Sequence, residues 1–191
     1  MKQLKVVVTD HIFPSRTIEE KALEGLGVEL VFANCRTEDE VIQMVSDADA
    51  VLTTYAPVTA KAIAAMTKCK LIARYGVGVD NVAVAEATKR GITVCNVPDY
   101  CVHEVSEHAL AMLLALTRRL PQIGADVRTG HWDFRPFRPL HRLHGKTLGL
   151  IGLGRIAGAL AGKATALGLR MLAYDPYVKS DSAAAVHTSL V

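Results

Sequence analysis

The sequence predicts an α/β protein built on doubly wound parallel sheets, and three observations support this prediction. A helical stretch, then a glycine, then a β-branched or apolar run occurs three times, around Gly27, Gly91 and Gly168. Glycine readily forms the left-handed cap that ends a helix before a strand begins. The strand candidates are mostly continuous apolar runs, as expected for parallel strands covered on both faces. Finally, the stretch TLGLIGLGRIAGAL, residues 147–160, is typical of a strand, a glycine turn and a helix in succession.

The first hundred residues contain most of the strand candidates. We expect strands at Leu4–Thr9, Ala50–Thr54 and Leu71–Arg74, and further strands directly after Gly27 and Gly91. Helical stretches separate these runs, and such alternation is typical of an α/β domain. We therefore predict a first domain over residues 1–100 and a second over residues 101–191.

A long helix is expected to lead into the second domain. It should run over about Val102–Leu120, with Pro98 before it and Pro121 after it, because proline breaks the interior of a helix.

Beyond this helix only two strands are clear, Thr147–Ile151 and Leu169–Tyr174, with one helix between them. A dinucleotide-binding fold uses about six strands. We therefore expect residues 145–191 to be poorly ordered or prone to aggregation in isolation.

Composition excludes several classes of protein. Half of the 191 residues are hydrophobic and about a fifth are charged, which is typical of a soluble globular chain. The longest apolar run, Ala109–Leu116, is too short to span a membrane, and the N-terminal residues do not resemble a signal peptide. Four scattered cysteines without a close pair favour a reducing compartment, so we expect a cytoplasmic protein.

Positive charge is concentrated in the second half of the chain. Residues 1–100 hold 11 basic and 13 acidic side chains, whereas residues 101–191 hold 11 and 6. The basic stretch at 128–146 contains two prolines and lacks helical periodicity, so we interpret it as a solvated crossing segment and expect no nucleic-acid partner. His141 and His144 have no second ligand pair nearby in the sequence, and we expect no metal site.

The glycine turn in the second domain has the pattern G-x-G-x-x-A, formed by Gly152, Gly154 and Ala157. Gly152 permits a tight turn, Gly154 lets the backbone approach a pyrophosphate, and the small Ala157 allows close packing of helix on strand. Asp175 follows Gly154 by 21 residues, at the end of the next strand. This spacing favours a dinucleotide site over an ordinary strand-to-helix turn, and the carboxylate favours NAD over NADP.

A second glycine turn, ARYGVGVDN, follows the strand Leu71–Arg74. Gly76 and Gly78 would expose successive backbone N–H groups, which could hold a small carboxylate with help from Arg74. The same pattern also suits a purely structural turn, so both interpretations stay open.

Two long stretches resemble the family of D-isomer-specific 2-hydroxyacid dehydrogenases, which includes D-3-phosphoglycerate dehydrogenase. They are RYGVGVDNVAVAEATKRGITVCNVPDYCVHEVSEHALAMLLALTRR and GKTLGLIGLGRIAGALAGKATALGLRMLAYDPYV. VCNVPDYCVHEVSEHAL, with YAPVTA upstream, is most similar to the branch related to the C-terminal-binding-protein corepressors. The resemblance implies a flavodoxin-like N-terminal substrate domain, followed by the first βαβ part of a Rossmann NAD-binding domain.

The resemblance also implies an activity and a set of binding residues. The activity is NAD-dependent oxidation or reduction at the CH–OH group of a D-2-hydroxy acid, with hydride transfer between C2 and the nicotinamide. The long helix of the family often forms a homodimer interface. The resemblance implies that Val77 and Gly78 bind the substrate carboxylate, with Tyr55 nearby. It implies that Val105 contacts the nicotinamide and that Asp175 binds the adenosine ribose. Arg155 and Ile156, beside Gly152 and Gly154, would contact the pyrophosphate.

No catalytic residue is carried over. The arginine, glutamate and histidine of the family lie well downstream of the ribose-binding acid, and only 16 residues follow Asp175 here. His187 is too close to Asp175 to match, and His103, Glu107 and His108 suit packing or surface roles on the long helix. We therefore expect a chain truncated within the NAD-binding domain and doubtful activity for these 191 residues alone.

Two alternatives to this enzyme stay open. The first is an NAD-responsive, corepressor-like scaffold whose output is partner binding and which needs no catalysis. The second is a naturally short protein that keeps the front half of the fold for oligomerisation.

Overall fold

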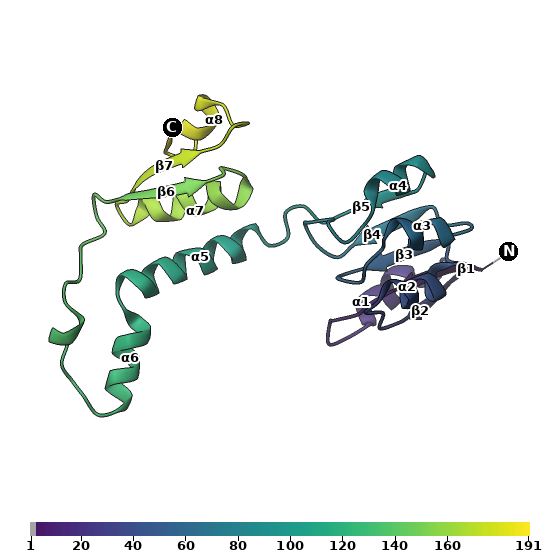
Figure 1. Cartoon of the computed structure of the whole chain (residues 1–191), viewed down its shortest axis with the longest axis horizontal. Helices are drawn as coiled ribbons and strands as arrows, with labels where there is room; N and C mark the ends of the chain where they lie inside the picture. Colours follow the sequence, from purple (N-terminus) through teal and green to yellow (C-terminus); the bar gives the residue numbers. More distant parts are fainter. Residues whose placement is uncertain (1–2) are drawn as a thin grey trace. The chain divides into compact units, whose positions relative to one another are not determined.

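Two separate parallel sheets, one in each half of the chain, form the framework of the computed structural model, which describes residues 3–191 (Figure 1). The chain divides into two units, Met1–Tyr100 and Cys101–Val191. Both sheets are parallel throughout and alternate with helices. The α/β prediction is therefore confirmed.

The first unit contains a five-stranded sheet in the order β2-β1-β3-β4-β5. This is the flavodoxin-like order of a doubly wound sheet, in which the strand order reverses direction between β1 and β3. Runs rich in β-branched residues, VVV in β1 and VLT in β3, favour these strands and explain the two-sided burial of the central strands. The strands are β1 (Leu4–Val8), β2 (Val28–Phe32), β3 (Ala50–Thr53), β4 (Leu71–Arg74) and β5 (Thr93–Cys95).

Four helices connect these strands: α1 (Thr17–Leu23), α2 (Glu38–Val45), α3 (Ala60–Ala65) and α4 (Val84–Lys89). Two of them begin at a threonine whose hydroxyl accepts a backbone N–H bond: Thr37, in a reciprocal capping box with Glu40, and Thr59. As the sequence predicts, Gly27 and Gly91 have left-handed φ angles of 65° and 67° just before β2 and β5.

The core of the first unit lies between the sheet and the helices α2, α3 and α4. Fully buried residues from the strands meet fully buried residues from the helices in one cluster. Its largest members include Ile63 on α3 and Ile72 on β4, both without exposed surface. The helix contributions are Val41, Val45, Ala62, Ile63 and Ala87, and the strand contributions include Val7, Val51 and Ile72.

The second unit contains a three-stranded sheet in the order β6-β7-β8. Gly168, with φ of 76°, ends the helix before β7, as predicted. The elements in chain order are α5 (Val102–Thr117), α6 (Leu120–Arg128), the 3-10 turn η1 (Arg135–Phe137), β6 (Thr147–Ile151), α7 (Arg155–Ala166), β7 (Arg170–Tyr174), α8 (Ser180–Ala184) and β8 (Thr188–Leu190).

The predicted end of the long helix is wrong. Helix α5 ends at Thr117, the chain turns at Arg119 with a left-handed φ of 52°, and a second helix begins at Leu120. Pro121 lies in the first turn of α6. Backbone N–H groups in the first turn of a helix have no acceptor within that helix, so the N–H that proline lacks is not missed there. Proline therefore starts a helix here and does not follow the end of one.

The expectation of only two strands after this helix is also wrong. Residues 180–190 form the short helix α8 and the strand β8, which pairs in parallel with β7. Strand β8 has three residues, of which only one is apolar, so the sequence contains no apolar run that would predict this strand. The side chains Leu153, Ala173 and Ala183 form a small core beneath this added strand.

Helix α5 packs along α7 through a polar contact at one end. The ammonium of Lys163 donates to Ser106 Oγ at 2.7 Å, to Glu107 Oε1 at 3.0 Å and to the carbonyl of His103 at 3.2 Å. Ser106 is fully buried there. Among residues 3–191 no helix is long and apolar enough to cross a membrane.

We predict that the core of the first unit depends on Ile63. Changing Ile63→Ala should lower the free energy of unfolding of this unit by about 2–5 kcal/mol, because a fully buried side chain leaves a cavity. The control is Ile18→Ala, since Ile18 is 79% exposed. Urea unfolding followed by far-UV circular dichroism measures both variants. A loss for Ile63→Ala no larger than that for Ile18→Ala would contradict this core.

Candidate ligand sites at the carboxyl ends of the two sheets

A hollow of about 220 Å³ lies in the first unit, where the loops after β1, β3, β4 and β5 come together. In open α/β sheets ligands bind outside the carboxyl ends of the strands, beside the point where the strand order reverses. We call this feature the carboxyl-end hollow. It is lined by Ile12, Phe13, Thr54, Tyr55, Arg74, Tyr75, Gly76, Val97 and Tyr100.

The buried carboxylate of Asp10 ties the loop after β1 to the loop after β3. Its Oδ1 accepts from the backbone N–H of Thr54 at 2.9 Å, and its Oδ2 accepts from the N–H of Tyr55 at 2.6 Å. The hydroxyls of Thr9 and Thr53 donate to the same Oδ1, and the Thr54 hydroxyl donates to the Asp10 carbonyl. Asp10 is 6% exposed, so these bonds compensate for its loss of water.

Sequence reasoning missed Asp10. The available signal is an acidic residue directly after the apolar run VVVT, at the carboxyl end of a predicted strand. The loop that Asp10 holds contains Tyr55, which the family resemblance places near the substrate. The structure puts the Tyr55 side chain, 68% exposed, on the wall of the carboxyl-end hollow.

Arg74 reaches the same hollow from the end of β4. Its guanidinium lies directly against Gly76, so that a Cβ on Gly76 would overlap with the Arg74 Nη1 and Cζ atoms. A side chain at position 76 would therefore displace the end of the flexible Arg74 side chain, whereas the φ angle of Gly76 does not itself require a glycine. The Nε of Arg74 is buried and has no hydrogen-bond partner within residues 3–191. Arg74 also lines the carboxyl-end hollow and is the charged residue among its lining.

Within residues 3–191, the glycine turn after β4 leaves free the N–H groups of Val77 and Gly78, the pair that the family resemblance implies, and not the pair of Gly76 and Gly78 expected from the glycine pattern. The N–H of Gly76 donates to the Arg74 carbonyl at 2.9 Å, so the expectation that Gly76 offers a free donor is wrong. Within the described part of the chain, the N–H groups of Val77 and Gly78 have no acceptor, and both residues are exposed. Asn96 Nδ2 donates to the Val77 carbonyl at 2.7 Å and thereby fixes the turn. Two consecutive free N–H groups suit a carboxylate.

A buried polar cluster supports one wall of the hollow. The hydroxyl of Tyr75 donates to Glu19 Oε1 at 3.0 Å, and His11 Nε2 lies 3.6 Å from the same oxygen. Burial, followed by the nearby Glu19 carboxylate, raises the pKa of Tyr75 far above its ordinary value. Tyr75 therefore stays protonated at neutral pH and acts as a fixed part of the wall.

In the second unit, the glycine turn between β6 and α7 has the backbone that the sequence predicts. Gly152 has a left-handed φ of 87°, and its N–H donates to the Tyr174 carbonyl at 2.8 Å. Gly154 precedes α7 in an extended conformation, and a Cβ there would meet nothing within 4 Å. The left-handed φ angle thus explains a glycine at position 152, whereas neither the φ angle nor the packing requires a glycine at position 154.

Asp175 lies directly beside this turn. Its Oδ2 accepts from the Leu153 N–H at 2.7 Å, and its Oδ1 accepts from the N–H groups of Tyr177 and Val178 at 2.8 and 3.1 Å. These bonds, led by the one from Leu153, lower the pKa of Asp175 below its ordinary value. The carboxylate is therefore ionised at neutral pH and holds the glycine turn against the end of β7.

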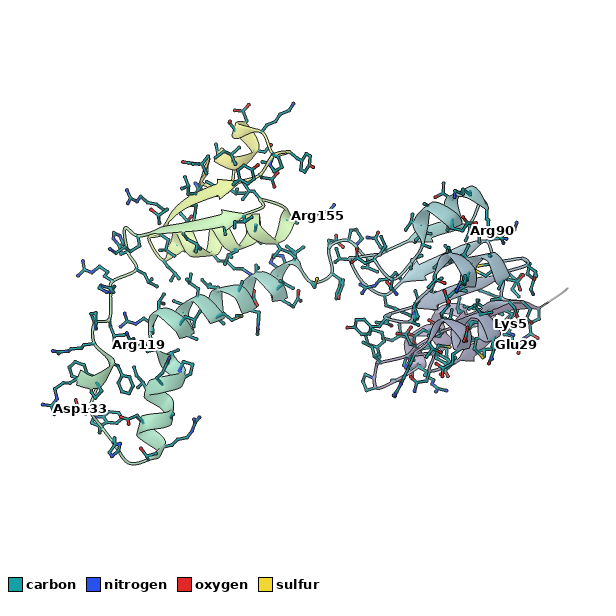
Figure 2. All side chains as sticks on the ribbon, in the orientation of Figure 1. Lys5, Glu29, Arg90, Arg119, Asp133 and Arg155 are labelled. Carbon is teal, nitrogen blue, oxygen red and sulfur yellow. The ribbon has the colours of Figure 1, made fainter. Side chains whose placement is uncertain are left out.

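The other residues implied for the cofactor lie in the same unit. Arg155 and Ile156 are the first two residues of α7, and Figure 2 shows Arg155 at that end of the helix. Val105 lies in the first turn of α5 and is 43% exposed. Gly158 and Gly162 share a face of α7, but only Gly158 closely faces another side chain, that of Val186.

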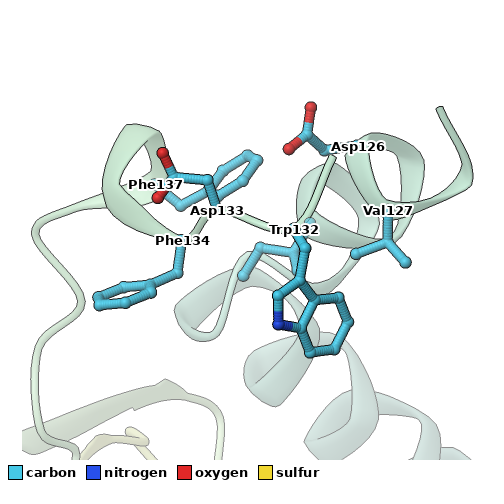
Figure 3. Close-up of a pocket in the computed structure, with 7 residues that line it drawn as sticks. Asp126, Val127, Trp132, Asp133, Phe134 and Phe137 are labelled. Atoms are coloured by element: carbon cyan, nitrogen blue, oxygen red, sulfur yellow. The ribbon is translucent and has the colours of Figure 1, made fainter. Parts of the chain in front are cut away.

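A second hollow, of about 190 Å³, lies between α6 and η1 (Figure 3). Trp132, one of its lining residues, is 90% exposed. No ligand is predicted for this segment from the sequence. Its lining consists of Ile123, Asp126, Val127, Trp132, Asp133, Phe134 and Phe137.

Comparison with known proteins gives consistent matches over nearly the whole chain. The family model of the D-isomer specific 2-hydroxyacid dehydrogenase catalytic domain matches residues 6–188. D-3-phosphoglycerate dehydrogenase of Methanocaldococcus jannaschii is 39% identical over 189 residues, which are 98% of this chain and 35% of that protein. The corresponding enzyme of Mycobacterium tuberculosis is 39% identical over 187 residues, 97% of this chain and 34% of that one. The chain thus spans about a third of the length of these curated relatives.

A solved structure shows the same fold. D-lactate dehydrogenase from Aquifex aeolicus, complexed with NAD and lactic acid, superposes with a TM-score of 0.84 at 26% identity. The match covers 97% of this chain and 55% of that one. The predicted combination of a flavodoxin-like sheet and the first part of a Rossmann sheet is confirmed by the strand orders and by this likeness.

We predict that the Leu153 amide reports the ionisation of Asp175. Its NMR chemical shift should titrate with a midpoint below 3.8, the ordinary pKa of an aspartate carboxyl, because the three N–H bonds favour the charged form. The folded pKa lies below the unfolded one, so this stabilisation is complete above the unfolded pKa. It is lost as the pH falls through the folded pKa.

Two variants control this measurement. Asp175→Asn should remove the titration of the Leu153 amide, whereas Asp181→Asn should leave it in place. A Leu153 midpoint above 3.8, or an unchanged titration in Asp175→Asn, would disprove the contact.

Proposed function

The chain belongs to the D-isomer specific 2-hydroxyacid dehydrogenase family, and we propose that the whole protein is an NAD-dependent oxidoreductase acting on the CH–OH group of a D-2-hydroxy acid. The observation that carries this proposal is the glycine turn of the second unit with Asp175 bound to it. That turn combines a glycine with a left-handed φ angle, an unobstructed glycine, the N-terminus of a 12-residue helix and an ionised carboxylate. These are the groups that a dinucleotide needs.

The residues present fit a dinucleotide at this turn. The empty space beside Gly154 lets a pyrophosphate approach the backbone, where the first N–H groups of α7, from Arg155 and Ile156, favour negative charge. A carboxylate has about four lone-pair positions and Asp175 uses three, so one remains for a ribose hydroxyl. Val105 would contact the nicotinamide. Bound NAD⁺ would accept the hydride that leaves C2 of the acid, with a 2-oxo acid, NADH and a proton as products.

The substrate carboxylate would bind in the first unit. The free N–H groups of Val77 and Gly78 provide two donors, and the positive charge of Arg74 lies nearby at the end of β4. Tyr55 would lie beside the substrate on the wall of the carboxyl-end hollow. No residue of this chain is assigned to proton transfer.

We also propose a homodimer through α5. Its exposed apolar residues Met112 and Leu116 are spaced by four positions, so they share one face of the helix. The four cysteines are free thiols, which supports a reducing cytoplasmic location.

The corepressor-like scaffold, and the placement near the corepressor-related branch, stay predictions. Such a scaffold needs the dinucleotide site alone, whereas the dehydrogenase needs both the dinucleotide site and the acid site. Binding of a 2-oxo acid therefore separates the two functions.

We predict that the 191-residue chain binds NAD⁺ ten- to a hundredfold more tightly than NADP⁺, a difference of about 1.4–2.8 kcal/mol, because Asp175 repels a 2′-phosphate. Asp175→Ala should reduce the preference for NAD⁺ over NADP⁺. Gly154→Ala should weaken both dinucleotides while lowering stability by at most about 1 kcal/mol, since its Cβ meets no protein atom. Calorimetric titration and thermal unfolding measure these quantities.

The matched control is Gly162→Ala, another glycine whose Cβ would meet nothing within 4 Å but which lies inside α7. It should bind both dinucleotides like the parent. Equal affinity for NAD⁺ and NADP⁺ would refute the role of Asp175. Parent-like binding by Gly154→Ala would refute the pyrophosphate position.

A further inference from the structure

The carboxyl-end hollow has walls that are far more apolar than an acid-binding site requires. Five large apolar or aromatic side chains of its lining are between 43% and 68% exposed: Ile12, Phe13, Tyr55, Val97 and Tyr100. They come from the loops after three different strands, and the sheet topology brings them together. A contiguous exposed apolar patch of this kind marks a binding surface.

The hollow offers positive charge for one anionic group only. Arg74 is the only charged residue among the described residues that line it. With the N–H groups of Val77 and Gly78, Arg74 can compensate for one carboxylate. A phosphate ester would bring a further charge of about −1.5 to −2 against apolar walls, and a buried charge without partners is strongly disfavoured.

Part of the wall, at Tyr55, Tyr75 and Phe13, is held in place by protein contacts. Asp10 fixes the backbone of Tyr55, and Glu19 fixes the hydroxyl of Tyr75. The rings of Phe13 and Tyr75 meet edge to face, with their centroids 5.6 Å apart. A preformed apolar wall binds an apolar group without the cost of ordering its own side chains.

We propose that the carboxyl-end hollow receives the side chain of a 2-oxo or 2-hydroxy acid whose side chain is branched aliphatic or aromatic. This inference rests on the proposed function, because the acid's carboxylate must bind at Arg74, Val77 and Gly78. The hollow therefore selects against a phosphorylated acid such as 3-phosphoglycerate. Its volume of about 220 Å³ suits a small acid and is below the range of about 300–1,000 Å³ typical of sites for drug-sized ligands.

NMR titration of the ¹⁵N-labelled 191-residue chain tests the proposal with four acids: pyruvate, 4-methyl-2-oxopentanoate, phenylpyruvate and 3-phosphoglycerate. All acids that bind should shift the amides of Val77 and Gly78. Each buried methylene is worth about a fourfold gain in affinity. The branched and aromatic acids should therefore bind at least about tenfold more tightly than pyruvate or 3-phosphoglycerate.

Three variants sharpen the test. Ile12→Lys should reverse the preference toward 3-phosphoglycerate, whereas Ile18→Lys, on the exposed face of α1, should leave it unchanged. Gly76→Ala should weaken all four acids by a similar factor, because it displaces the Arg74 guanidinium.

The outcomes distinguish this inference from the proposed function. If no acid shifts Val77 and Gly78, the acid site itself is wrong, and the proposed function falls with it. If pyruvate or 3-phosphoglycerate binds as tightly as phenylpyruvate, the acid site stands and the apolar selectivity is wrong.

Discussion

The carboxylate of Asp10 is the constraint on which the first unit's candidate site depends. It sits where the strand order of a doubly wound sheet reverses, between the ends of β1 and β3, and both of its oxygens accept backbone N–H groups. Loops at this edge have N–H groups that no neighbouring strand can satisfy, and buried N–H groups need an acceptor. By supplying that acceptor, Asp10 sets the position of Tyr55 and therefore one wall of the carboxyl-end hollow.

In the second unit, Asp175 likewise supplies an acceptor for loop N–H groups. This residue also follows a parallel strand, and its carboxylate also accepts the N–H of a loop after the neighbouring strand. The two carboxylates differ in burial: Asp10 is enclosed, whereas Asp175 keeps contact with solvent. An enclosed carboxylate with four donors serves structure alone, whereas an accessible one with a remaining lone pair can also bind a ligand. The same chemistry thus fixes a loop in each unit, and only in the second unit does the carboxylate stay accessible.

Periodicity and glycine chemistry predicted most of the sheets. The strands Leu71–Arg74 and Thr147–Ile151 have the bounds that their apolar runs indicate, and the three helix-ending glycines have left-handed φ angles. Short elements escaped prediction. Strand β8 has too few apolar residues to produce a recognisable pattern. Pro121 indicates a helix boundary, but proline occurs both after the end of a helix and in its first turn, so the residue alone does not distinguish the two.

The candidate sites divide in the same way. The glycine turn and Asp175 belong to one strand–helix–strand unit, and their spacing in the sequence is typical of a dinucleotide site. Both could therefore be predicted from the sequence. Asp10 and the walls of the carboxyl-end hollow come from loops far apart in the sequence. Only the strand order brings them together, so no local pattern could reveal them.

The most direct test of this account is the stability of Asp10→Asn, measured by urea unfolding beside Glu29→Gln, an exposed carboxyl-to-amide control on β2. The amide retains one acceptor but turns an NH₂ toward the N–H of Thr54 or Tyr55, so one buried donor loses its partner. We predict a loss of about 1–3 kcal/mol for Asp10→Asn and little change for Glu29→Gln. The amides of Thr54 and Tyr55 should also shift in the NMR spectrum. Equal stability of both variants, with those amides unmoved, would contradict the central role of Asp10.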